Sequence, residues 1–79
     1  MTVSTIDVIA IVYKELNRAR KKFPPFRSMH EGYAIIYEEL EELWEEIKKK
    51  DKRKIHHEAV QLAAMSLRFL SDFEEMVSQ

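Results

Sequence analysis

The chain has 79 residues and a formal net charge of −1, and it contains no cysteine, one glycine and two prolines. At this length we expect a single domain over residues 1–79, and the lack of cysteine excludes disulfides and thiolate metal sites. The small net charge predicts no nucleic-acid partner, and no run of 18 apolar residues is present that would predict a membrane span. Because the N-terminal residues lack the basic start and the cleavage site of a signal peptide, we expect a cytoplasmic protein with no membrane partner.

Helical periodicity runs through the chain and is interrupted at two places, the segments KKFPPFRS and KKKDKRK. The first helix is expected to begin near Ser4, with Asp7 three residues later as its capping-box partner. It should end before Pro24, because the residue that precedes a proline avoids the helical conformation. Its apolar residues recur at spacings of three and four, as in an amphipathic helix: Ile6, Ile9, Val12, Tyr13 and Leu16.

The second helix is expected to begin at Ser28, where SMHE reads as a capping box between Ser28 and Glu31. It should end in the cluster Lys48–Lys50, because cations suit the C-terminal end of a helix dipole. One side of this helix forms a continuous apolar stripe, which predicts that Tyr37 and Trp44 lie in the core. The stripe consists of Tyr33, Ile36, Tyr37, Leu40, Leu43, Trp44 and Ile47.

The third helix is expected to start after a turn at Asp51 and to run to about Val77. It is apolar almost all the way round, which is typical of a helix that is buried on every side. Two partner helices from one short chain would not easily cover it, so we expect it to lie near a subunit interface. The sequence therefore predicts an all-α fold, a protomer of three antiparallel helices that assembles into a homo-oligomeric helical bundle, either a dimer or a tetramer.

The glutamates of YEELEELWEEI fall into two groups when each residue advances the helix by about 100°. Glu38, Glu41 and Glu45 lie opposite the apolar stripe and are expected to be solvated. Glu39, Glu42 and Glu46 lie on one flank of the stripe, and Glu39 and Glu42 are neighbours on the helix surface.

Glu58 and Gln61 lie within the apolar segment HHEAVQLAAMSLRFL of the third helix. An antiparallel pair of helices would bring Glu58 close to Glu39 and Glu42. Three converging carboxylates repel one another, and a divalent ion would relieve that repulsion. Oxygen ligands favour Mg²⁺ or Mn²⁺ over zinc. The alternative is structural, because ExxE patterns arise by chance in glutamate-rich helices and Glu58 could pair with a lysine or a histidine.

The strings EELEEL and EAVQLAAM together resemble the motifs of MazG-like all-α nucleoside triphosphate pyrophosphohydrolases, in particular a small branch found in phage and prokaryotes. The signature of that superfamily is ExxE on one helix and ExxD on the next. Glu39 and Glu42 match the ExxE, Glu58 matches the glutamate of the second motif, and Gln61 stands where the family usually has aspartate. The resemblance covers roughly residues 15–73.

The resemblance implies an enzyme that cleaves the α–β phosphoanhydride of a nucleotide and releases a nucleoside monophosphate and pyrophosphate. It implies Mg²⁺, with Mn²⁺ as an alternative, held by Glu39, Glu42 and Glu58, and an oligomeric assembly that completes the site. Gln61 would ligate the metal through its carbonyl oxygen or hydrogen-bond a metal-bound water. An amide brings no negative charge, so a second reading is a non-catalytic helical interaction module that has lost turnover.

Two residues near the start of the second helix are candidates for contact with the substrate. Arg27 precedes a positively polarised helix N-terminus, which suits a phosphate group, and His30 follows the helix cap. A plain surface role is the alternative for both. Asp72 would lie about 16 Å beyond Gln61 along a continuous helix, so we do not expect it to act as a metal ligand.

Overall fold

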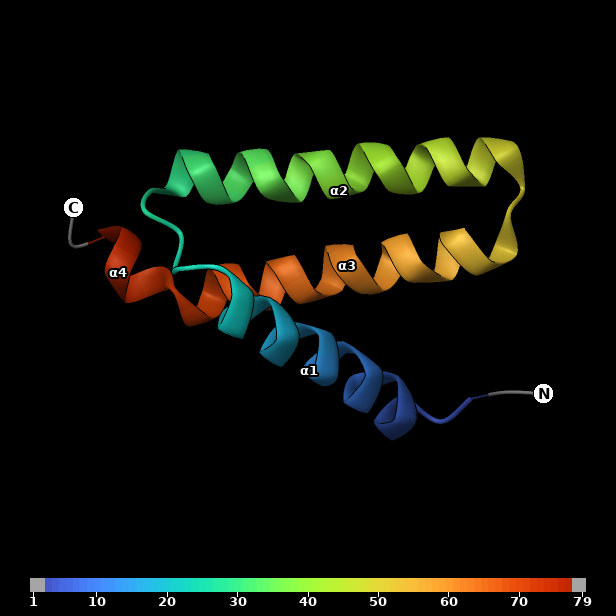
Figure 1. Cartoon of the computed structure of the whole chain (residues 1–79), viewed down its shortest axis with the longest axis horizontal. Helices are drawn as coiled ribbons and strands as arrows, with labels where there is room; N and C mark the ends of the chain where they lie inside the picture. Colours follow the sequence, from blue (N-terminus) through green and yellow to red (C-terminus); the bar gives the residue numbers. More distant parts are fainter. Residues whose placement is uncertain (1–2, 78–79) are drawn as a thin grey trace.

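The computed structural model describes residues 3–77, and this part of the chain contains four helices and no strand. α1 spans Thr5–Lys22, α2 spans Met29–Lys49, α3 spans Lys52–Ser71 and α4 spans Phe73–Val77. α2 and α3 form an antiparallel hairpin, and α1 packs on the other side of α3 and runs in the same sense as α3 (Figure 1). The prediction of an all-α fold is confirmed.

Side-chain caps define the starts of the three long helices. The backbone N–H of Asp7 donates to Ser4 Oγ at 3.2 Å, and that of Glu31 donates to Ser28 Oγ at 3.0 Å. At the start of α3 the N–H of Lys54 donates to Asp51 Oδ1 at 3.2 Å. Each cap satisfies a backbone donor that has no partner within its helix. The predicted helix starts near Ser4, Ser28 and Asp51 are therefore confirmed.

The ends of α1 and α2 also agree with the sequence. α1 ends at Lys22, shortly before Pro24, and α2 ends at Lys49 inside the predicted lysine cluster. Lys50 follows α2 in the left-handed conformation, with a φ of 60°, and its N–H donates back to the carbonyl oxygen of Ile47. This tight ending allows α3 to return directly along α2.

The prediction that the third helix continues to about Val77 is wrong. α3 ends at Ser71, and α4 begins at Phe73. The break falls at Asp72, whose side chain accepts a hydrogen bond from the backbone N–H of Phe26 at 3.0 Å. This contact holds the chain at Asp72 against the loop before α2, and α4 then turns so that Met76 is buried.

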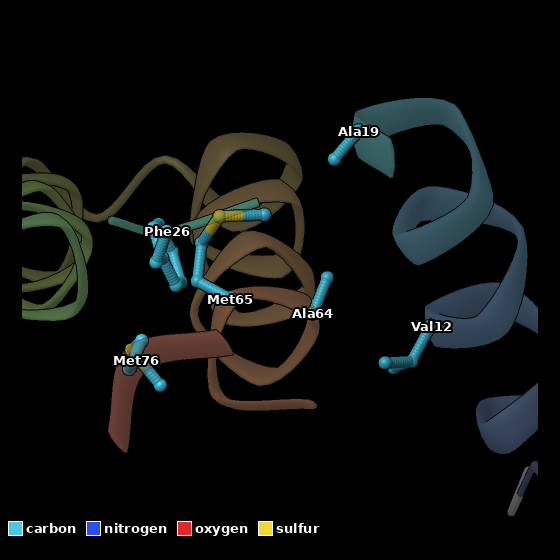
Figure 2. Close-up of a cluster of buried hydrophobic side chains, with 6 residues drawn as sticks. All are labelled: Val12, Ala19, Phe26, Ala64, Met65 and Met76. Carbon is cyan, nitrogen blue, oxygen red and sulfur yellow. The ribbon is translucent and has the colours of Figure 1, made fainter. Parts of the chain in front are cut away.

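The core lies around α3, where α1, the loop at residues 23–28 and α4 meet it. In Figure 2, Ala64 of α3 points towards Val12 and Ala19 of α1, whereas Met65 lies on the side of Phe26. Ala64 and Phe26 are almost fully buried. The small side chain of Ala64 permits the close approach of α1 to α3.

α2 also approaches α3 closely, and this approach depends on Gly32. A Cβ atom at Gly32 would lie 2.5 Å from Cδ2 of Phe69 on α3, which is far closer than van der Waals contact. The absence of a side chain at this position therefore sets the distance between the first turn of α2 and the last turns of α3, where the residues of the loop at 23–28 pack.

The prediction that Tyr37 and Trp44 lie in the core is wrong for the single chain. Their exposed fractions are 49% and 54%, and Leu40 between them is 50% exposed. The reason is that α2 uses a neighbouring face, which includes Gly32, Ile35 and Ile36, to pack on the core. The apolar surface of α2 is therefore wider than the part of it that packs against α3.

α3 lies between α1 and α2 (Figure 1), and its apolar surface is covered in part. Ala64 and Met65 are buried and Val60 and Ala63 pack against them, whereas Leu70 remains 68% exposed. Leu67 is also exposed, at 41%, so the helices of one chain leave part of α3 uncovered. The expectation that α3 lies near a subunit interface stays a prediction. Within residues 3–77, no helix is both long and apolar enough to cross a membrane.

Candidate metal centre

Glu39, Glu42 and Glu58 converge between α2 and α3. One carboxylate oxygen from each residue lies within 4.8 Å of the other two. Glu39 and Glu42 are one turn apart on α2, and the hairpin places Glu58 of α3 opposite them. The structure thus brings together the three carboxylates that the sequence predicted to be close. We call them the acidic trio.

The acidic trio is partly withdrawn from solvent and lacks compensating donors. Oε2 of Glu39 and Oε2 of Glu58 are buried and have no hydrogen-bond partner. Desolvation, followed by the charges of Glu42 and Glu58, raises the pKa of Glu39 to about 7. Desolvation and the adjoining Glu58 carboxyl also raise the pKa of Glu42. An ionised trio without a cation is therefore electrostatically unfavourable.

These residues fit a divalent cation. The two buried oxygens without donors are free to accept a metal, and the three ligands are hard oxygen donors of the kind that Mg²⁺ and Mn²⁺ prefer. Glu46, one turn further along α2, also has a buried oxygen without a hydrogen-bond partner, Oε1. Its carboxylate lies 3.9 Å from Nζ of Lys49, however, so its charge already has a counter-ion.

Gln61 lies next to Glu15 of α1. The amide of Gln61 helps to lower the pKa of Glu15, although the larger cause is the hydrogen bond that Glu15 accepts from Arg18. The guanidinium of Arg18 lies 2.6 Å from Glu15 Oε2. Glu15 is thus a further acidic residue near this part of α3. The sequence reasoning missed it, because nothing in the spacing of α1 indicates which of its polar residues faces α3. Ligation of a metal by Gln61 stays a prediction.

A cleft of about 500 Å³ adjoins the acidic trio and includes Glu39 in its wall. Its apolar walls include Phe26 from the loop, Ile35 from α2 and Met65 from α3. The lining thus combines apolar side chains with acidic ones, Glu31, Glu38 and Glu39, and basic ones, Arg18, Arg27 and Arg68. This arrangement suits a ligand that has an apolar or aromatic part and an anionic part bound through a cation.

The two residues predicted to contact substrate differ in position. Arg27 lines the cleft, where its side chain is 83% exposed and its Nε lies 3.3 Å from Oε2 of Glu31. His30 is exposed and is not among the residues that line the cleft. Contact with substrate stays a prediction for both residues, and the geometry favours Arg27.

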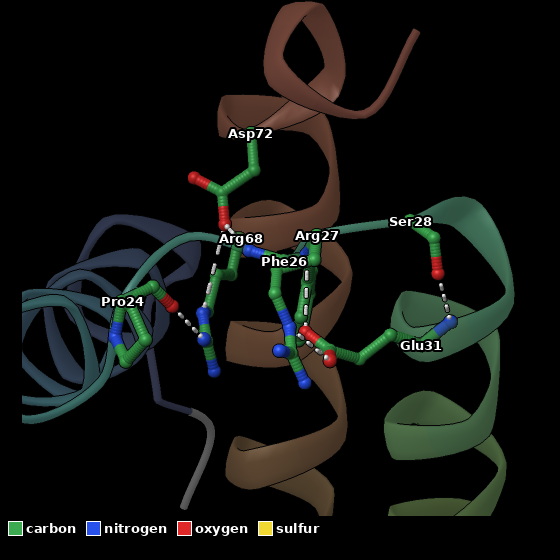
Figure 3. Close-up of polar contacts among 7 residues, drawn as sticks. All are labelled: Pro24, Phe26, Arg27, Ser28, Glu31, Arg68 and Asp72. Carbon is green, nitrogen blue, oxygen red and sulfur yellow. Dashed lines mark hydrogen bonds and ion pairs between the residues drawn. The ribbon is translucent and has the colours of Figure 1, made fainter. Parts of the chain in front are cut away.

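A buried ion pair holds the loop that forms one wall of the cleft. Arg68 and Asp72 are 6% and 5% exposed, and Arg68 Nε lies 3.7 Å from Asp72 Oδ2. Arg68 also donates to the carbonyl oxygen of Pro24 at 2.6 Å, and its guanidinium lies 4.1 Å from the centre of the Phe26 ring (Figure 3). Both ends of the loop segment Pro24–Phe26 are thereby fixed to the C-terminal part of α3. The spacing of four between an arginine and an aspartate in an apolar helix was the available signal, and the sequence reasoning did not use it.

Comparisons with protein-family models, with curated proteins and with solved structures give no match to this chain. The likeness to MazG-like enzymes therefore depends on the motif residues of α2 and α3 alone.

Proposed function

We propose that the chain is a metal-dependent nucleotide pyrophosphohydrolase, which converts a nucleoside triphosphate into a nucleoside monophosphate and pyrophosphate. The observation that carries the proposal is the acidic trio, which combines mutual proximity with two buried oxygens that have no hydrogen-bond partner. The adjoining cleft and the resemblance of EELEEL and EAVQLAAM to the MazG-like motifs support it.

In this proposal each part of the site has a separate task. Glu39, Glu42 and Glu58 hold the divalent ion, which when bound supplies charge neutralisation at the phosphates and activation of a water molecule. The apolar walls at Phe26 and Met65 cover the base and exclude water from it. The three carboxylates would hold the ion between α2 and α3, next to the cleft that Glu39 lines.

The experiment is a pyrophosphate-release assay with canonical and oxidised nucleotides in Mg²⁺ and in Mn²⁺, combined with calorimetric metal titration. Glu58→Gln should abolish both hydrolysis and the rise in melting temperature that Mg²⁺ or Mn²⁺ produces, because binding to the folded state alone stabilises it. Glu41→Gln is the matched control, since Glu41 lies on the same helix as the trio but on its exposed side. If Glu58→Gln binds metal as the wild type does, the metal centre is not at the acidic trio.

A second candidate function is a non-catalytic helical module. The observation that favours it is Gln61, which stands at the usual aspartate position and lies beside Glu15. Gln61→Asp separates the two readings, because it restores the charge that the family motif carries. Tighter metal binding and increased hydrolysis in Gln61→Asp support the enzyme, whereas the absence of turnover in both proteins supports the module.

We also propose that the chain assembles with further copies of itself. Two stripes of large apolar side chains are exposed, one on α2 around Tyr37, Leu40 and Trp44 and one on α1 around Ile9 and Tyr13. Exposed apolar surface on this scale is typical of an interaction site. A 79-residue chain also has a small core and gains stability by association. A second copy presents the same stripes and can cover them by a two-fold arrangement.

A further inference from the structure

A second cavity is lined by residues of α1 and α3, which lie side by side in Figure 1. It has a volume of about 440 Å³, and we call it the α1–α3 groove. Lys14 and Arg18 of α1 and Arg53, His56 and His57 of α3 contribute to its lining. None of the residues of the acidic trio lines it, so it is distinct from the candidate metal centre.

The lining of the α1–α3 groove has an excess of positive charge. Its one acidic residue, Glu15, forms a close ion pair with Arg18. Lys14 and Arg53 form no ion pair with any carboxylate in the described chain, residues 3–77. With neutral histidines, three cations and one carboxylate leave a charge of +2 in the groove. A concave surface with charge of one sign concentrates the electrostatic potential and attracts counter-ions.

The groove lies close to the acidic trio. His57 lines the groove and directly precedes Glu58 of the trio on α3. Arg18 lines both the groove and the cleft beside Glu39. The cleft, the acidic trio and the basic groove therefore lie near one another along α3, where a ligand of several linked groups can reach them.

We propose that the α1–α3 groove binds the pyrophosphate part of an oligophosphate ligand. Lys14 of α1 and Arg53 of α3 line the same groove, and both lysine and arginine form charge-assisted hydrogen bonds to phosphate oxygens. The groove is a local cavity and the whole chain has a net charge of −1, which disfavours a long nucleic-acid strand. That this pyrophosphate is the leaving group of the reaction rests on the proposed function.

The experiment is a calorimetric titration of sodium pyrophosphate into the full chain at pH 8 in the presence of EDTA. Saturable binding is expected without metal. Arg53→Gln and Lys14→Gln should each weaken it about tenfold, which corresponds to the loss of one charge-assisted hydrogen bond. Lys52→Gln is the matched control, because Lys52 is exposed at the same helix end, carries the same charge and does not line the groove. It should change the affinity by less than about twofold.

Three results would overturn the proposal: no binding of pyrophosphate, equal weakening by Lys52→Gln and Arg53→Gln, or equal affinity for orthophosphate and pyrophosphate.

Glu58→Gln separates this proposal from the proposed function. That variant should lose metal-dependent hydrolysis and still bind pyrophosphate in EDTA. If the chain hydrolyses no nucleotide but binds pyrophosphate with the expected changes, the groove proposal stands and the hydrolase proposal is refuted. If the chain hydrolyses nucleotides and Arg53→Gln leaves pyrophosphate binding unchanged, the hydrolase proposal stands and the groove proposal is refuted.

Discussion

Glu39 of α2 is both partly buried against α3 and close to two other carboxylates. Its place on the flank of the apolar stripe brings its carboxylate against α3, and the same place puts it beside Glu42 and Glu58. Partial burial and these two neighbours raise its pKa to about 7. The sequence predicted the convergence from helical spacing alone, because an antiparallel hairpin leaves little freedom in which turns face each other. The raised pKa could not be predicted in the same way, because it depends on how far packing against α3 removes the carboxylate from water.

The raised pKa of Glu39 makes stability fall as pH rises. In the unfolded chain the carboxyl loses its proton near its ordinary pKa of 4.5, whereas in the folded chain it keeps the proton until about pH 7. Between these values the folded state binds more protons, so the free energy of unfolding decreases with increasing pH. We expect the melting temperature in EDTA to fall between pH 5 and pH 8, by about 4–8 °C for each ~1 kcal/mol lost.

Thermal melts of Glu39→Gln provide the check, because the amide cannot ionise and should flatten this part of the pH profile. Saturating Mg²⁺ should reduce the fall in the wild type, and Glu41→Gln should leave it unchanged. The pKa values of Glu15, Glu31 and Glu45 are lowered, so these residues affect stability only at more acidic pH. The stability that their ionised forms contribute is lost as the pH falls below their ordinary pKa. A profile that Glu39→Gln does not alter would contradict the assigned cause.

At the scale of the elements, helix starts were predictable and the end of α3 was not. Each start is encoded locally by a Ser or Asp cap, so a few neighbouring residues suffice to identify it. The end of α3 depends on Asp72 and its contact with Phe26, which is 46 residues away in the chain. Periodicity continues through Asp72 into α4, because apolar residues on both sides of the break pack on the same core. A contact between distant segments leaves no signal in local spacing.

Asp72→Ala should destabilise the fold strongly. It removes the carboxylate that accompanies the buried guanidinium of Arg68 and the acceptor for the Phe26 N–H. Loss of one partner of a buried ion pair costs about 3–5 kcal/mol. Asp72→Asn should cost less than Asp72→Ala, because its amide oxygen can still accept from Phe26. Urea unfolding of the three proteins measures the difference. Equal stability of Asp72→Ala and the wild type would show that the loop is held by other contacts.

At the scale of the whole molecule, the total apolar content indicated association, but the position of the exposed surface was not predictable. The sequence pointed to α3, which is apolar all round. The structure places α3 between α1 and α2, leaves Leu67 and Leu70 of α3 exposed, and exposes the outer stripes of α1 and α2 as well. The helical wheel of α2 cannot separate the face that packs on α3 from the adjacent face around Trp44, because both are apolar.

Leu40→Glu should disrupt the proposed assembly while the helices persist. Leu40 is 50% exposed in the middle of the α2 stripe, and a carboxylate at an apolar interface is costly when it has no partner. Ala34→Glu is the matched control, since it adds the same charge at an exposed position of α2 outside the stripe. Sedimentation should show a smaller species for Leu40→Glu only, with unchanged helical circular dichroism. A wild-type chain that stays monomeric and folded at micromolar concentration would refute the assembly.

The central position of α3 also determines how the molecule can open. α1 and α2 each pack mainly on α3, and the loop at residues 23–28 joins them (Figure 1). When α1 detaches, the α2–α3 hairpin and the acidic trio therefore keep their mutual contacts, whereas the α1–α3 groove loses one wall. Local unfolding of this kind divides the chain into units of different stability. The trio belongs to the more persistent unit, and the groove exists only while α1 is docked.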